Sequence, residues 1–155
     1  MHDEQCISCA TLGGHHQPPG GIVYEDGYWV FFLRSRPLLV PGQGFIVLKR
    51  HCEHLDELTE SELAALGPMM RKSQVALDRV LQPAKVHFGL YAEDVKHIHL
   101  HVIPRLSTMP KGNIRMTFLH RWYEFLAYLH LKQPYPDTAV AEVAIQLHQA
   151  FHAEA

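Results

Sequence analysis

The stretch His97-Ile98-His99-Leu100-His101-Val102-Ile103-Pro104-Arg105 places three histidines at alternate positions between aliphatic residues. Such alternation predicts a β-strand. Because successive side chains of a strand point to opposite faces, the three imidazoles share one face and the aliphatic side chains share the other. One face is therefore polar and the other belongs to a core. Pro104 cannot donate a backbone hydrogen bond, so strand pairing should end there or lie at an edge.

Two further strand signals precede this stretch. Residues 22–24 and 28–33 predict a β-hairpin with Asp26-Gly27 in its turn. Residues 45–48, Phe-Ile-Val-Leu, are continuously apolar and predict a strand covered on both faces. Gly and Pro are frequent in residues 10–21 and 34–42, which we therefore expect to be loops.

The remaining chain predicts helices and one more strand. Thr59 and Glu62 have the spacing of a capping box, which predicts a helix that starts there and ends at Gln82-Pro83. We expect the other segments to be a strand over 86–91, a turn over 92–94, a loop over 106–118, a helix over 120–131 and a terminal helix over 139–151 capped by Asp137 or Thr138.

Hairpins combined with helices predict an α+β fold with an antiparallel sheet, one long helix and a C-terminal helix. The chain has 155 residues, of which 47% are hydrophobic, enough for a hydrophobic core. No internal repeat is evident, so we expect one domain over 1–155.

Charge and hydropathy exclude some classes of partner. The net charge of −2 provides no basic field for bulk nucleic-acid binding. No apolar run approaches the ~18–20 residues that span a bilayer. The N-terminal residues Met1-His2-Asp3-Glu4 lack the apolar region of a signal peptide, so we expect a cytoplasmic protein.

Imidazole can act as nucleophile, base or metal ligand near neutral pH. In a row of three, one neutral ring can attack an electrophile such as phosphorus while a neighbour donates hydrogen bonds to the phosphoryl oxygens. The third can bind a metal or orient the others. A histidine metal site, or a surface strand with no special chemistry, is the alternative interpretation.

The cysteines point to a metal more than to disulfides. The chain has three, Cys6, Cys9 and Cys52, and an odd number without a signal peptide argues against a disulfide framework. Cys6-Ile7-Ser8-Cys9 is a C-x-x-C, and two thiolates at this spacing can supply half of a zinc site. Cys52 is expected to be a small buried side chain.

Residues 97–103 resemble the signature of the histidine-triad (HIT) superfamily, in which three histidines alternate with apolar residues. Pro104-Arg105 continues the pattern as in many members. Residues 41–51, Pro-Gly-Gln-Gly-Phe-Ile-Val-Leu-Lys-Arg-His, resemble a second stretch of that family, Pro-Gly-His-x-Leu-Val-φ-Pro-Lys-x-His, where φ is apolar. The resemblance covers roughly residues 6–105 and leaves 106–155 as a C-terminal extension.

This resemblance implies a function. Members are commonly homodimers that bind nucleotides or related phosphoesters, and their middle histidine attacks the α-phosphorus to give a nucleotidyl-histidine intermediate. By position, His99 would be the nucleophile, and His101 would bind the phosphate and assist the leaving group. Gln43 stands where the family has the histidine of Pro-Gly-His and is assigned with His101 to substrate binding. The implied activity is a nucleotide phosphoester or phosphoramidate hydrolase or a nucleotidyl transferase.

One branch of the superfamily, which includes bacterial members, carries a structural zinc. Its ligands are an N-terminal C-x-x-C, the histidine after the Lys-Arg segment and the first histidine of the triad. Here these are Cys6, Cys9, His51 and His97, a donor set that suits zinc. His54, His15 and His16 are rival ligands.

Some recognition residues differ from the family pattern. Nucleotide-binding members usually place an acidic residue before Pro-Gly-His to hold the ribose hydroxyls, whereas residues 34–38 read Arg-Ser-Arg-Pro-Leu. The two arginines either bind phosphate or are solvated. The usual Gly-Gln-Ser/Thr before the triad is replaced by residues 92–96, Ala-Glu-Asp-Val-Lys, and acids beside a phosphate site are unfavourable.

These departures leave two alternatives to the enzyme. One is a nucleotide-binding or regulatory module with little catalysis. The other is a metallo-hydrolase in which His97, His99 and His101 bind one catalytic metal.

Overall fold

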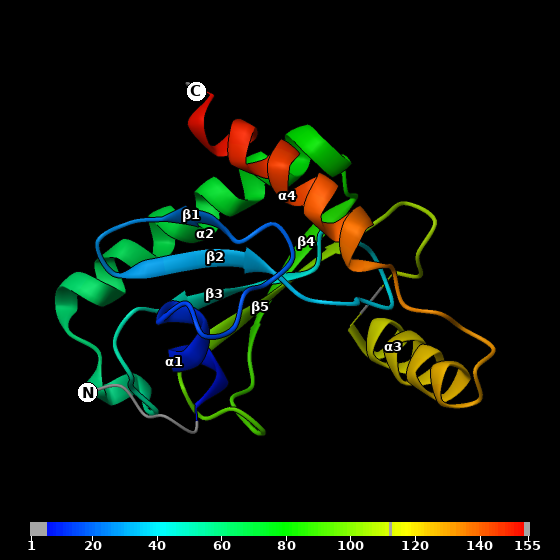
Figure 1. The fold of residues 1–155 in the computed structure, drawn as a ribbon, viewed down its shortest axis with the longest axis horizontal. Helices are drawn as coiled ribbons and strands as arrows, with labels where there is room; N and C mark the ends of the chain where they lie inside the picture. The colour runs from blue at the N-terminus through cyan, green and yellow to red at the C-terminus, as the bar shows by residue number, and fades with distance from the viewer. Residues whose placement is uncertain (1–5, 112, 154–155) are drawn as a thin grey trace.

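A five-stranded sheet forms the centre of the computed structural model, which describes residues 6–111 and 113–153 (Figure 1). All neighbouring strands are antiparallel, in the order β1-β2-β3-β5-β4. The strands are β1 (Ile22–Glu25), β2 (Trp29–Leu33), β3 (Gly44–Leu48), β4 (Lys85–Leu90) and β5 (His99–Arg105). The helices are α1 (Ile7–Leu12), α2 (Glu60–Leu81), α3 (Asn113–Tyr128) and α4 (Asp137–His152), with a short 3-10 helix, η1, over Leu55–Glu57. The predicted α+β fold is confirmed.

The predicted β1–β2 hairpin forms, and Asp26 closes its turn. The Asp26 carboxylate accepts hydrogen bonds from the backbone N–H groups of Tyr28 and Trp29, both at 2.8 Å. An aspartate that bonds to the backbone a few residues ahead stabilises a turn. The loop predicted over 10–21 is wrong at its start, because α1 extends to Leu12.

The capping box at the start of α2 is confirmed. The Thr59 hydroxyl accepts from the Glu62 backbone N–H at 3.3 Å, and the Glu62 carboxylate accepts from the Thr59 backbone N–H at 2.8 Å. These two bonds satisfy donors that have no partner within the helix. The helix ends at Gln82, whose φ of 47° is left-handed.

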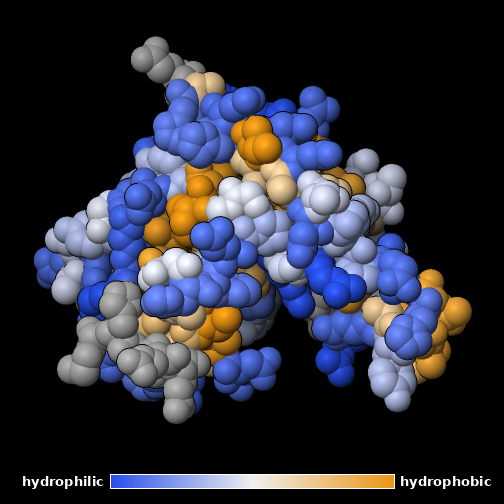
Figure 2. All heavy atoms as spheres, viewed as in Figure 1, coloured by the Kyte–Doolittle hydropathy of each residue, from blue (hydrophilic) through white to orange (hydrophobic). Residues whose placement is uncertain are grey.

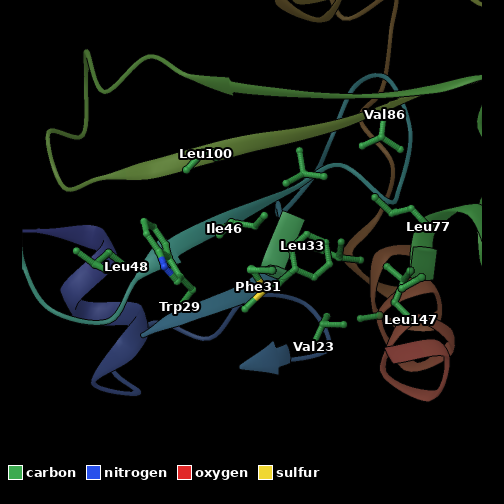
Figure 3. Close-up of a cluster of buried hydrophobic side chains, with 14 of the residues drawn as sticks. Val23, Trp29, Phe31, Leu33, Ile46, Leu48, Leu77, Val86, Leu100 and Leu147 are labelled. Carbon is green, nitrogen blue, oxygen red and sulfur yellow. The ribbon is translucent and has the colours of Figure 1, made fainter. Parts of the chain in front are cut away.

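One face of the sheet carries the main core, against α2 and α4 (Figure 3). Trp29, Phe31 and Leu33 of β2 point to this face, as the alternation of a strand requires. The intervening Val30 and Phe32 belong to a second cluster on the opposite face, with Val47, Leu12 of α1 and Phe45 packed against it. Strand β3 contributes to both clusters, so its predicted burial on both faces is confirmed.

Strand β5 lies between β3 and β4 in the sheet. Leu100 and Val102 are in the main core, so His99 and His101 occupy the opposite face. Pairing with β3 ends at Val102, while Pro104 still lies opposite Val86 of β4. The proline therefore stands where the strand has a partner on one side only.

The C-terminal part departs most from the prediction. Helix α3 begins at Asn113, inside the stretch expected to be a loop, and ends three residues before the predicted position. It lies to one side of the sheet in Figure 1, and Leu119 and Tyr123 pack against Leu39 and Val40. Hydrophobic residues gather on its outer part in Figure 2. Phe118 and Trp122 are among its exposed residues.

Helix α4 forms close to the predicted residues, but the predicted cap is wrong. Pro136 is the N-cap residue, and Asp137 is the first helical residue. The Asp137 carboxylate instead accepts from the Ser35 hydroxyl at 2.8 Å and from the Arg36 backbone N–H at 3.0 Å. A side chain engaged with a distant loop is not available to cap its own helix.

Candidate functional site

Four residues from three parts of the chain meet at one end of the sheet. Cys6 is the N-cap residue of α1 and Cys9 lies in its first turn, while His51 follows β3 and His97 precedes β5. Their ligand atoms all lie within 4.8 Å of one another. The Cys9 Sγ is 3.3 Å from His51 Nδ1, and His97 Nδ1 is 3.5 Å from Cys6 Sγ and 3.6 Å from Cys9 Sγ.

These distances match a tetrahedral metal centre. Zinc–sulfur bonds of ~2.3 Å and zinc–nitrogen bonds of ~2.0 Å at tetrahedral angles separate sulfur and nitrogen by ~3.6 Å. The other nitrogen of His97, Nε2, donates to the Leu48 carbonyl at 2.8 Å, which leaves Nδ1 as the ligand atom. His51 Nε2 lies 3.5 Å from the Glu53 carboxylate. The group is thus suited to binding a metal ion.

The rival ligands do not join this group. Among the described residues, the group that can hold a metal contains Cys6, Cys9, His51 and His97, and it includes neither His54 nor the pair His15 and His16. Cys52 is buried, as expected, and its thiol donates to the His54 carbonyl and to the Glu57 carboxylate, both at 3.3 Å.

An ion pair between the exposed Arg50 and the buried Glu62 holds the segment that carries His51. Arg50 donates to the two carboxylate oxygens of Glu62 at 2.6 and 2.9 Å. The hydrogen bond from Arg50 is the main reason that the pKa of Glu62 is lowered to about 2. The same guanidinium donates to the Glu57 carbonyl at 2.7 Å. His51 is therefore anchored to the start of α2 through the residue before it.

The second and third histidines of the row lie on the adjacent part of the same face. His99 Nδ1 donates to the His97 carbonyl at 2.7 Å, so its Nε2 carries the lone pair of the neutral ring. The rings of His99 and His101 are 5.1 Å apart, and Phe45 packs edge-on against both. The Tyr91 ring lies 5.2 Å from that of His101 on its other side.

His99 lines a cavity of about 130 Å³ between α1 and the sheet. Its walls are mainly apolar, and its polar groups come from α1, from the segment after β2, and from His16 and His99. The lining residues are Ile7, Ser8, Thr11, His16, Pro18, Phe32, Leu33, Arg34, Ser35, Phe45, Val47, Val95 and His99. A concave apolar site with a few polar groups is typical of small-molecule binding.

Gln43 is not among the residues that line this cavity. It is 2% exposed, and no described residue donates to its buried Oε1. Across β5, His87 of β4 also has a buried ring nitrogen without a partner in the described part of the chain. Burial, and then the charges of Arg105 and Lys85, lower the pKa of His87, which favours its neutral form.

The cavity also contains residues that the sequence did not single out. Ile7, Ser8 and Thr11 line it because they belong to α1, a helix that the sequence did not predict and whose last residues fall in the stretch expected to be a loop. Asp137 holds the segment after β2 from a distance of about a hundred residues along the chain. No local pattern indicates such contacts, because both depend on the tertiary fold.

The antiparallel sheet with three alternating histidines at the start of β5 is the arrangement expected of a histidine-triad α+β protein, and the Cys₂His₂ group is the one expected of its zinc-containing branch. The HIT domain model matches residues 15–108. The chain belongs to the HIT family.

Curated relatives agree with this membership. An uncharacterized HIT-like protein of Saccharolobus solfataricus is 30% identical over 110 residues, covering 68% of this chain and 77% of that protein. An asymmetrical bis(5'-nucleosyl)-tetraphosphatase of Schizosaccharomyces pombe is 32% identical over 89 residues, covering 54% of this chain and 48% of the enzyme. The chain thus aligns with about half of that enzyme's length.

Solved structures share the fold. A HIT-like protein from Bartonella henselae has a TM-score of 0.71 at 18% identity, covering 97% of this chain and 98% of that one. A zinc-bound histidine triad family protein from Mycobacterium smegmatis has a TM-score of 0.69 at 20% identity, covering 95% and 93%. Within the part of this chain that the structure describes, no helix is long and apolar enough to cross a membrane.

Proposed function

We propose that the protein is a nucleotide phosphoester or phosphoramidate hydrolase, or a nucleotidyl transferase, that acts through a nucleotidyl-histidine intermediate on His99. The observation that carries the proposal is the hydrogen bond from His99 Nδ1 to the His97 carbonyl beside an apolar cavity. A ring held in this tautomer presents an unprotonated Nε2 as the nucleophile. Family membership and the S. pombe tetraphosphatase support the same class of chemistry.

The proposed reaction has two displacements. In the first, the Nε2 lone pair of His99 forms a bond to the α-phosphorus, and the bond to the leaving group breaks with its electron pair. His101 hydrogen-bonds the phosphoryl oxygens and assists protonation of the leaving group. In the second, water or another acceptor attacks the same phosphorus and releases His99. Gln43, beside the pairing of Phe45 with His101, supports substrate binding through its buried amide.

We assign a structural zinc to Cys6, Cys9, His51 and His97. The ligand distances support this assignment, and the M. smegmatis relative is described as zinc-bound. When bound, the metal would supply a cross-link between the N-terminal segment and the sheet, as structural zinc does in other small domains. These four residues would hold it and take no part in bond cleavage.

The geometry disfavours a metal shared by the three histidines. His97 Nδ1 faces the two thiols, and its Nε2 is occupied by the Leu48 carbonyl. Neither His99 nor His101 belongs to the metal-ligand group among the described residues. The binding module remains the second candidate, because Glu93 and Asp94 stand where the family has polar phosphate contacts.

Two further properties belong to this proposal. We propose that 1–155 act as one domain, because α4 of the C-terminal extension contributes Val140, Ala144 and Leu147 to the main core. We also propose the homodimer that the family resemblance implies.

The activity is tested with adenosine phosphoramidate, dinucleoside polyphosphates and nucleoside-diphosphate sugars. Wild-type protein should turn over at least one, and His99→Ala should lose turnover by roughly a thousandfold or more, as expected for a nucleophile. The control is His148→Ala, an exposed histidine on α4 outside the cavity, which should keep full activity. Turnover that survives His99→Ala would exclude the proposed nucleophile.

A further inference from the structure

Arg34 is the one residue of the cavity whose charge the proposed reaction does not use. It directly follows β2, in phase with Val30 and Phe32, so it lies on the same face as His99. Its backbone N–H donates to the Gln43 carbonyl at 2.8 Å, which fixes its position at the end of the hairpin. Its side chain is half-buried and lines the cavity together with His99.

Arg34 brings a positive charge without a carboxylate partner to the wall of the cavity. None of the other lining residues carries a permanent charge. In the described part of the chain, no carboxylate pairs with Arg34. Asp137, the acid that contacts this segment, is engaged with the Ser35 hydroxyl and the Arg36 backbone N–H. The part of the cavity beside Arg34 therefore favours the binding of an anion.

The position of Arg34 separates this anion from the reacting phosphate. Arg34 lies opposite Gln43, whereas His99 lies opposite Val47, two strands away from β2. With ~4.8 Å between strands and ~3.4 Å per residue, the two backbones are roughly 17 Å apart. A ligand that contacts both side chains extends across the cavity, with its apolar part against Phe32 and Phe45.

The chemistry of the side chain limits what this end of the ligand is. A guanidinium has five N–H donors and no acceptor. A pair of ribose hydroxyls is held best by a carboxylate acceptor, whereas a phosphate accepts two parallel hydrogen bonds from arginine. The charge at this end thus favours a phosphorylated ribose over a free one.

We infer that Arg34 binds a second phosphate of the substrate, and that the substrate is a nucleotide with this phosphate on its ribose. The inference rests on the proposed function, because His99 defines where the 5′-phosphate lies. Arg34 is then the residue that selects this substrate class over nucleotides with free ribose hydroxyls.

Product binding tests the inference without turnover. Calorimetric titration of the metal-loaded protein would compare AMP, ADP, adenosine 2′,5′-bisphosphate and adenosine 3′,5′-bisphosphate. One of the two adenosine bisphosphates should bind about ten- to a hundredfold more tightly than AMP. This is the range expected for a charge-assisted hydrogen-bonded pair. The gain should shrink as salt is raised, because the charges are partly exposed.

Arg34→Gln should abolish this gain, measured as the ratio of the bisphosphate affinity to the AMP affinity of the same variant. The matched control is Arg36→Gln, an exposed arginine of the same segment that does not line the cavity, which should keep the gain. The inference is overturned if AMP binds but neither bisphosphate binds more tightly, or if Arg34→Gln keeps the gain in affinity. It is also overturned if only ADP shows a gain in affinity that depends on Arg34. If neither AMP nor the bisphosphates bind, the proposed function fails as well.

Discussion

His99 combines two features that the sequence pattern alone could not provide. The alternation of histidines predicts which side chains share a face. The alternation does not say which ring nitrogen of His99 carries the proton. That depends on the 2.7 Å hydrogen bond from Nδ1 to the His97 carbonyl, which forms where the chain bends just before β5. The alternation treats the three histidines alike, and only the family resemblance separated His97 as a metal ligand from His99 as the nucleophile. In the structure His97 faces the thiols and His99 lines the cavity.

At the residue scale, the Arg50–Glu62 pair predicts how stability depends on pH. The folded pKa of Glu62, about 2, is below its ordinary value of 4.5, so the unfolded state binds its proton first as pH falls. The pair's contribution is complete above about pH 4.5 and is lost as pH falls towards 2. The shift corresponds to about 3 kcal/mol before screening, and solvent screening lowers the contribution because the Arg50 side chain is 42% exposed.

Glu62→Gln measures this contribution. The free energy of unfolding from urea titrations should fall by about 2–3 kcal/mol at pH 7, and the difference from wild type should vanish towards pH 2. The control is Glu60→Gln, an exposed residue of the same first helical turn. Equal stability of wild type and Glu62→Gln at pH 7 would show that the ion pair contributes nothing.

At the element scale, α1 joins the metal group to the cavity. Its first turn contains Cys9, and Ile7, Ser8 and Thr11 of the same helix line the cavity. A six-residue helix is too short to be stable alone, so its position depends on what anchors it. The spacing of Cys6 and Cys9 predicted a metal site, but a helix this short has no sequence signal of its own and was not predicted.

Loss of the metal should therefore weaken ligand binding without removing the nucleophile. Cys9→Ser, or chelation of the wild type, should release about one zinc per chain, lower the melting temperature and weaken AMP binding several-fold. Cys52→Ala, which removes a buried thiol outside the metal group, should keep its zinc. Metal content, thermal melting and calorimetry measure these effects. Purified protein without zinc, and with a melting temperature unaffected by chelator, would contradict the assignment.

At the scale of the whole molecule, the C-terminal extension completes the core. The family pattern ended near residue 105, and the sequence beyond it predicted a terminal helix over 139–151 but gave no packing partner for it. In the structure Leu147 is fully buried among residues of α2 and the sheet. What a helix packs against depends on contacts far apart in the chain, and local periodicity contains no information on them.

Leu147→Ala should destabilise the protein by about 2–5 kcal/mol, because it leaves a cavity in the main core. Leu131→Ala, the same change at a residue that is 73% exposed, should cost within about 0.5 kcal/mol. Chemical denaturation of both variants measures the difference. If the two variants are equally stable, α4 is not part of the cooperative core, and the single-domain proposal is wrong.

The central claim is that His99 carries the nucleotidyl group during turnover. The most direct measurement is to quench the reaction with adenosine phosphoramidate or a dinucleoside polyphosphate under alkaline conditions and to map the adduct by tandem mass spectrometry. We expect an adenylyl group on His99 in the wild type and none in His99→Ala. Turnover without an adduct on His99, or an adduct on another residue of the 97–101 stretch, would contradict it.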